Sequence, residues 1–221
     1  MTGHLLIVGA GPGIAAATAR RLGRDGYAVG LVARREESLA ALGGELRGEG
    51  LDVEWATAQS GDPSSLAAAV DRLVEATGPV DVLLYNVSVG RDAGVPELSP
   101  EDLLADLAAG AAGLQTAVRA VLPGMRERGS GTVLATGSGA ADKPIASMAS
   151  LGVQKAALRA LVEVQAMALA PEGIHVAMAL VRGLVRDDRI PPSRIADLYA
   201  DLVAETTGPR EHWRTVVDVT S

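Results

Sequence analysis

His4-Leu5-Leu6-Ile7-Val8-Gly9-Ala10-Gly11-Pro12-Gly13-Ile14-Ala15 is the stretch that decides the fold. A short apolar run that ends at glycine is typical of a buried strand. The glycines permit a sharp turn and a close approach of a ligand. The helix expected after this turn offers free N–H groups and a positive dipole end to a pyrophosphate. The stretch therefore predicts a dinucleotide-binding turn, with a plain strand-to-helix turn as the alternative. The residues expected to contact the cofactor are Gly9, Gly11, Pro12, Gly13 and Ile14.

The composition is typical of one globular domain with a sizeable core, because the chain has 221 residues and 48% of them are hydrophobic. Phenylalanine is absent, so Ala, Leu and Val must build that core. The absence of cysteine excludes disulfides and thiolate metal sites. The net charge of −7 argues against a general nucleic-acid binder. No stretch resembles a signal peptide or a membrane span, so we expect a cytoplasmic protein without a membrane partner.

Strands alternate with helices along the whole chain, which predicts a parallel sheet of about seven strands with helices on both faces, an α/β fold. After the first strand, strands are expected at 27–33, 51–57, 80–85, 131–136, 174–180 and 213–219. Helices are expected at 15–25, 36–47, 65–77, 99–128 with a bend at its glycines, 147–170 and 192–204. Asp62 or a neighbouring serine should cap one helix, and Ser99 another. Ligands bind beyond the carboxyl ends of such strands, so the loops 86–98, 137–146 and 183–192 should line the site.

Two arginines, Arg34 and Arg35, directly follow the second expected strand. In a dinucleotide fold this strand end faces the adenosine ribose. An acidic residue there would bind the ribose hydroxyls of NAD, whereas arginines suit the 2′-phosphate of NADP. The alternative is a solvated helix start in which Glu36 and Glu37 pair with the two arginines. The sequence thus favours NADP(H) over NAD(H).

Several motifs occur in a family's order and spacing, and through them the chain resembles the short-chain dehydrogenase/reductase family over nearly its full length. They are Gly9 to Ala15, Asp81 to Asn86, Leu122 to Met125, Gly131 to Val133, Lys155 to Leu158 and Ala170 to Ile174. The resemblance implies one Rossmann domain over residues 1–221, a nicotinamide cofactor and a small-molecule substrate. It also implies a homodimer or homotetramer that pairs through the helices at about 100–128 and 147–170.

The expected active site departs from that family. The family places a proton-donating tyrosine four residues before a lysine, one helical turn apart. Here Lys155 is present, but Leu151 stands in the tyrosine's place, as in a divergent branch of the family with Ala-Ser-Leu there. The family's helper serine falls at Ser138, and its helix asparagine is replaced by Gly110. The resemblance implies that Ser138 polarises a carbonyl oxygen and that Lys155 holds the nicotinamide ribose.

Other cofactor contacts follow from the resemblance alone. Gln59 stands where the family holds adenine with an acid, followed by Ser60, and Asn86 ends the fourth strand. Arg182-Gly183 replaces the family's Pro-Gly, and Ala15 replaces the third glycine. The implied cofactor contacts are Gln59, Ser60, Asn86, Lys155 and Gly183. Arg182 would bind a ligand anion or pair with Asp187 or Asp188.

The remaining polar candidates are weaker. Asp142 and Lys143 lie in a loop at the expected site, as an acid or anion ligand or as idle solvated charges. The histidines His4, His175 and His212 have no metal-ligand spacing, so no metal is expected. The methionines 125, 148, 167 and 178 are expected in the core. Two functions stay open: an NADP(H)-dependent oxidoreductase with a replaced proton donor, or a redox-inactive protein that senses the cofactor, supports a partner subunit or catalyses a non-redox step.

Overall fold

The computed structural model describes residues 3–220 as a seven-stranded parallel sheet in the order β3-β2-β1-β4-β5-β6-β7. The strands are β1 (His4–Val8), β2 (Ala28–Ala33), β3 (Val53–Thr57), β4 (Val82–Tyr85), β5 (Gly131–Ser138), β6 (Ile174–Arg182) and β7 (Val216–Thr220). The chain winds outward from β1 to β3, then crosses back to β4 on the other side of β1. The predicted doubly wound α/β fold is confirmed, and its switch point lies between β1 and β4.

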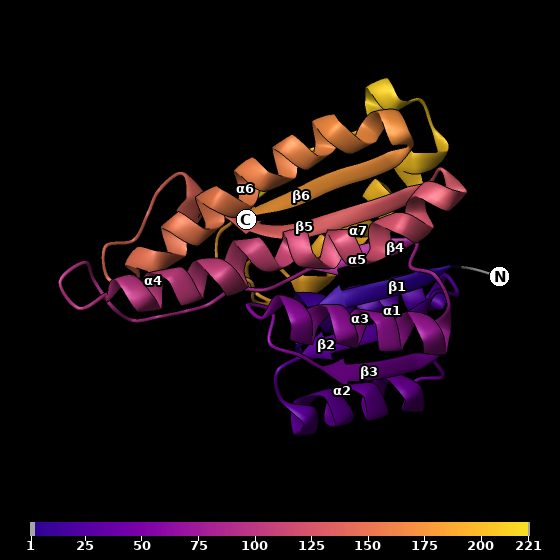
Figure 1. Cartoon of the computed structure of the whole chain (residues 1–221), viewed down its shortest axis with the longest axis horizontal. Helices are drawn as coiled ribbons and strands as arrows, with labels where there is room; N and C mark the ends of the chain where they lie inside the picture. Colours follow the sequence, from indigo (N-terminus) through magenta and orange to yellow (C-terminus); the bar gives the residue numbers. More distant parts are fainter. Residues whose placement is uncertain (1–2, 221) are drawn as a thin grey trace.

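Helices cover both faces of this sheet (Figure 1). One face packs against α1 (Ile14–Arg24), α2 (Glu36–Gly48) and α7 (Pro192–Ala204). The other packs against α3 (Pro63–Thr77), α5 (Gly113–Arg128) and α6 (Ala149–Leu169). Because side chains alternate along a strand, Leu5 and Ile7 of β1 enter the first core, while Leu6 and Val8 enter the second. A strand buried on both faces reads as a continuous apolar run, which explains its sequence.

The capping residues in the sequence predicted two helix starts correctly. The Asp62 carboxylate accepts N–H bonds from Ser64 and Ser65 at 2.9 and 3.2 Å, and Ser99 Oγ accepts the Asp102 N–H at 3.0 Å, so both caps are confirmed. The expected helix at 99–128 is instead α4 (Pro100–Leu107), a π-helical turn (Ala108–Ala112) and α5. The predicted bend at Gly110 is thus a π-helical turn.

The expected strand bounds were less accurate. Both β5 and β6 run two residues further than predicted, to Ser138 and Arg182, because they pair along their whole length. The last strand begins at Val216 and not at Trp213. The indole of Trp213 lies 5.0 Å from the His175 ring instead, and its N–H donates to Glu205 O at 2.8 Å. A tertiary contact therefore holds a residue whose β-propensity predicts a strand.

The methionine prediction is wrong at one position. Met125 and Met178 are buried, but Met167 is 72% exposed on α6. It shares an outer stripe of that helix with the exposed Val153 and Val164. The expected pairing of copies through these helices stays a prediction. No helix among residues 3–220 combines the length and apolar character that crossing a membrane requires.

Candidate functional site

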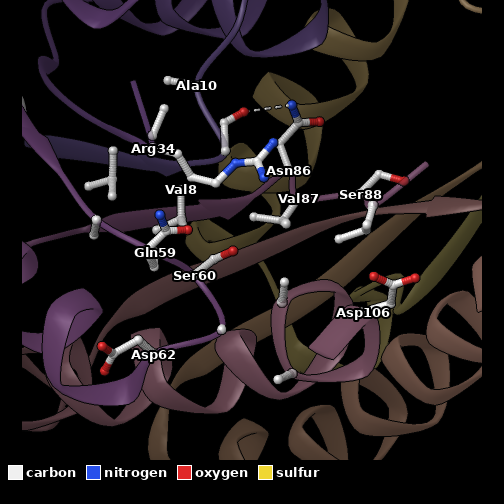
Figure 2. A pocket seen from close by; sticks show the side chains of 18 of the residues that line it. Val8, Ala10, Arg34, Gln59, Ser60, Asp62, Asn86, Val87, Ser88 and Asp106 are labelled. Atoms are coloured by element: carbon white, nitrogen blue, oxygen red, sulfur yellow. Dashed lines mark hydrogen bonds between the residues drawn. The ribbon is translucent and has the colours of Figure 1, made fainter. Parts of the chain in front are cut away.

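A cavity of about 560 Å³ lies beyond the carboxyl ends of β1, β2, β3 and β4, where the topology predicts a ligand (Figure 2). Its walls include six of the predicted cofactor contacts: Gly9, Arg34, Arg35, Gln59, Ser60 and Asn86. Six others do not line it: Gly11, Pro12, Gly13, Ile14, Lys155 and Gly183. Of the three loops expected around the site, only the one after β4 lines this cavity. The cavity therefore covers the adenosine side of the expected site.

The glycine turn has the form that a dinucleotide requires. Gly9 has φ +88°, and a Cβ there would lie 2.7 Å from the Asn86 carbonyl oxygen. Its N–H donates to Val32 O at 2.9 Å, which fixes the turn on β2. A Cβ on Gly11 or Gly13 would meet no atom within 4 Å, and Gly13 caps α1 without any side-chain bond. The open space and the free helix N-terminus fit a pyrophosphate.

Arg34 and Arg35 are exposed and line one end of the cavity. Within residues 3–220 neither forms an ion pair, so the alternative pairing with Glu36 and Glu37 is not present. The Glu36 carboxylate instead accepts the Trp55 indole N–H at 2.9 Å. Ser38, in the first turn of α2, lines the same end and was not predicted. The two guanidinium groups are available to an anionic ligand.

Lys155 is 3% exposed, and the group that it bonds after β4, Val87, lines the cavity. Its ammonium group donates to Val87 O at 2.9 Å and to Thr136 O at 3.0 Å, so it ties the end of β4 to β5. Leu151 lies one turn earlier on α6. Burial lowers the pKa of Lys155 to about 8, because desolvation disfavours the charged form. Its predicted grip on a ribose stays a prediction.

The lowered pKa of Lys155 makes a stability prediction. Below pH 8 the lysine is protonated in both states, and between pH 8 and about 10.5 only the unfolded chain keeps the proton. The unfolded state then binds more protons, so the unfolding free energy should rise with pH in this window, by up to roughly 3 kcal/mol. Urea denaturation of the wild type and Lys155→Met at several pH values tests this. Parallel curves for the two proteins would contradict it.

Ser138 ends β5, and its Oγ accepts the Ala140 N–H at 3.2 Å. The Ser138 hydroxyl is therefore bonded to backbone at the end of the strand. The serine's own proton has no acceptor among residues 3–220. Ser138 thus keeps a donor available at the carboxyl end of the sheet.

Arg182 has other partners than those predicted. It bonds Asp142 at 2.7 Å and Asp218 at 2.6 Å, while Asp188 pairs with Arg186. The pairing with Asp187 or Asp188 was wrong because strand β7 and the loop after β5 bring closer carboxylates. The Arg182 guanidinium holds the pKa of Asp142 below its usual range, so this carboxylate is a poor proton donor.

A polar cluster around a buried carboxylate at the far end of the cavity was not predicted from the sequence. Asp106 on α4 is 2% exposed and accepts two bonds from Arg91, at 2.9 and 3.0 Å, and one from Ser150 Oγ at 2.7 Å. These bonds, with the Arg91 bonds first in effect, hold the pKa of Asp106 below its usual range. Arg91 and Asp106 both line the cavity. No local pattern signals this pair, because its members are 15 residues apart across a loop.

Gln154 on α6 was also missed. Its side-chain amide bonds both the N–H and the C=O of Val89, at 3.0 and 2.9 Å, and Val89 lines the cavity. A Cβ on Gly110 would lie 2.2 Å from the Gln154 oxygen. Gln154 therefore occupies the space that a side chain at position 110 would need.

His4 and His175 are buried and bonded within the fold, whereas His212 is exposed. His4 contacts Gly78 O at 2.9 Å, and the His175 ring lies 3.0 Å from Leu202 O and 2.9 Å from Arg214 O. Neither these two nor His212 lines the cavity. Among the described residues, no group of three or more His, Asp or Glu side chains is arranged to hold a metal ion.

The sequence is similar to a known protein family and to known proteins. A family model described as short chain dehydrogenase matches residues 3–187. Dehydrogenase/reductase SDR family member 4 of Homo sapiens is 32% identical over 184 residues, 82% of this chain and 65% of that protein. The 2,3-dihydro-2,3-dihydroxybenzoate dehydrogenase of Bacillus subtilis (strain 168) is 32% identical over 151 residues, 68% of this chain and 58% of that protein. The chain thus spans less than two thirds of these relatives' lengths.

A solved structure extends the comparison. The crystal structure of a metagenomic short-chain oxidoreductase in complex with NADP superimposes with a TM-score of 0.87 at 28% identity. The match covers 98% of this chain and 96% of that one. The resemblance therefore includes α7, which lies beyond the residues matched by the family model.

Proposed function

The chain belongs to the short-chain dehydrogenase/reductase family, and from that premise we propose an NADP(H)-dependent oxidoreductase that acts on a carbonyl or alcohol group of a small molecule. We further propose that it works without the family's tyrosine, since Leu151 stands in that place. The dehydrogenase and reductase names of its relatives favour redox chemistry over a redox-inactive role.

One observation carries the proposal: Arg34 and Arg35, both free of ion pairs within residues 3–220, line the same cavity as Gly9 and Asn86. Two guanidinium groups suit a phosphate, which they can bind with several charge-assisted bonds. The open glycine turn beside them suits the pyrophosphate. The NADP complex of a structural neighbour agrees with this choice of cofactor.

The chemistry divides between the cofactor and the chain. When bound, the nicotinamide supplies or accepts the hydride. Leu151 has no exchangeable proton, so the proton that reduction adds to the substrate oxygen must come from another side chain or from solvent water. Ser138 has a free hydroxyl proton and can donate a bond to that oxygen. Lys155 donates to the carbonyl groups of Val87 and Thr136, where its charge stabilises negative charge that develops nearby.

Calorimetric titration of the purified protein with NADPH, and separately with NADH, tests the cofactor. We expect NADPH to bind more tightly. A panel of carbonyl compounds should then reveal oxidation of NADPH. Binding of neither nucleotide would overturn the proposal.

The same assay tests the residues. Ser138→Ala should lower the rate by about a hundredfold or more, the usual contribution of a positioned hydrogen-bond donor to a developing oxyanion. Ser147→Ala is the matched control, because Ser147 is an exposed serine in the following loop. Equal rates for the two variants would remove Ser138 from the mechanism while leaving the cofactor assignment intact.

A further inference from the structure

A buried chain of side-chain hydrogen bonds runs from α7 to the glycine turn. The Tyr199 hydroxyl lies 2.8 Å from Thr136 Oγ1, and Thr136 donates to Asn86 Oδ1 at 2.7 Å. The Asn86 amide then donates to Gly9 O at 3.1 Å. Tyr199 is fully buried and Thr136 is 9% exposed. The family resemblance assigns no role to Tyr199 or Thr136.

The donors and acceptors available give this series of hydrogen bonds one direction. Gly9 O accepts only, so the NH₂ of Asn86 must face it and the amide oxygen must face Thr136. Thr136 spends its one proton on that oxygen, so Tyr199 is the donor in its 2.8 Å bond with Thr136. Tyr199 shares its single proton with Ala135 O, to which the hydroxyl donates at the longer distance of 3.2 Å. Successive bonds in one direction polarise and strengthen one another.

This series of hydrogen bonds ends at Gly9, in the turn expected to bind the dinucleotide. Gly9 has φ +88° and packs against the Asn86 backbone, and the Gly9 and Ala10 amides both donate to Val32 O, at 2.9 and 3.0 Å. Lys155 adds a bond to Thr136 O at 3.0 Å. Removing the tyrosine hydroxyl would take one bond from Thr136, so the remaining bonds from Thr136 to Asn86 and from Asn86 to Gly9 would be weaker and less firmly oriented.

We propose that Tyr199 and Thr136 are positioning residues of the dinucleotide site, which act through Asn86 on the glycine turn. The effect on nucleotide affinity rests on the proposed function. The effect on the turn does not, because these bonds join residues of the protein to one another and involve no ligand atom.

Tyr199 does not replace the missing proton donor. Burial raises the pKa of its phenol above the ordinary value, and the side chain has no exposed surface. A phenol of that kind neither reaches a substrate nor loses its proton near neutral pH. Its role is therefore to orient other groups.

Amide hydrogen exchange of the ligand-free protein is the first test. Tyr199→Phe should speed exchange at the Gly9 and Ala10 amides by about three- to tenfold, as expected for the loss of one buried hydrogen bond. Tyr85→Phe is the matched control, because Tyr85 is also fully buried and its hydroxyl donates to a backbone carbonyl, that of Ala109. This control should lose stability but keep the exchange rates of the turn.

NADPH affinity is the second test. Tyr199→Phe and Thr136→Val should each weaken NADPH about three- to tenfold, and Thr136→Ser, which keeps the hydroxyl, should restore it. In an Asn86→Ala background, Tyr199→Phe should change neither affinity nor exchange further.

The outcomes separate the two proposals. The proposal that Tyr199 positions the glycine turn would be overturned if Tyr199→Phe lost as much stability as Tyr85→Phe but left amide exchange at Gly9 and Ala10 unchanged. If Tyr199→Phe does not fold, Thr136→Val against Thr136→Ser gives the same decision. A wild type that binds no NADPH would overturn the proposed function. The exchange data would still show whether Tyr199 and Thr136 position the glycine turn.

Discussion

Gly9→Ala should abolish NADPH binding and lower the unfolding free energy by roughly 2–4 kcal/mol. Two physical causes act together at this position. The backbone has φ +88°, where a Cβ is strained, and that Cβ would lie 2.7 Å from the Asn86 carbonyl oxygen. The neighbour is the backbone directly after β4, which is held by the bond from Asn86 N–H to Val8 O, so it cannot move aside cheaply. Urea denaturation and calorimetric titration measure the two effects.

Gly11→Ala provides the matched control for this prediction. Its φ is not positive, and a Cβ there meets no atom within 4 Å. The variant should therefore keep its stability to within about 0.5 kcal/mol. It should still bind NADPH less tightly, because the added methyl group occupies the space left for the pyrophosphate. If Gly9→Ala and Gly11→Ala prove equally stable, the account of the turn is wrong.

The second large effect should come from the two arginines. The double variant Arg34→Ala/Arg35→Ala is expected to bind NADPH on the order of a hundredfold more weakly, while NADH binding changes little. The physical reason is that only NADPH carries the 2′-phosphate that these guanidinium groups would bind. Both side chains are exposed, so the difference should shrink as the salt concentration rises.

A second double variant separates the local contact from the change in net charge. Arg72→Ala/Arg119→Ala removes the same charge at exposed positions that do not line the cavity. It should leave the preference for NADPH over NADH intact. An equal loss of NADPH affinity in both double variants would show that Arg34 and Arg35 act only through the overall field of the protein.

Sequence alone determined the order of the elements and several of their ends. The run Leu5 to Val8 is apolar throughout, which requires burial on both faces, and the glycine turn after it permits only a few connections. The caps at Asp62 and Ser99 are local, since each side chain bonds an amide two or three residues away. Such signals are readable because the interacting groups are neighbours in the chain.

Part of the site was also predictable from sequence. Gly9, Arg34 and Asn86 each follow a strand of the parallel sheet, so the topology alone brings them to one edge. The loss of the family's tyrosine at Leu151 is likewise visible in the sequence. What these residues bond to was not predictable, because each partner comes from another strand or helix.

Only the tertiary structure decided the polar contacts beneath and around the cavity. Three hydrogen bonds join residues far apart in the sequence: Arg182 and Asp218 are 36 residues apart, Lys155 and Val87 are 68 apart, and Tyr199 and Thr136 are 63 apart. Each bond depends on which elements the sheet order makes neighbours and on which side chains then share a buried space. The linear pattern carries the periodicity that builds the strands and helices, whereas the partners of a buried polar group are set by packing between them.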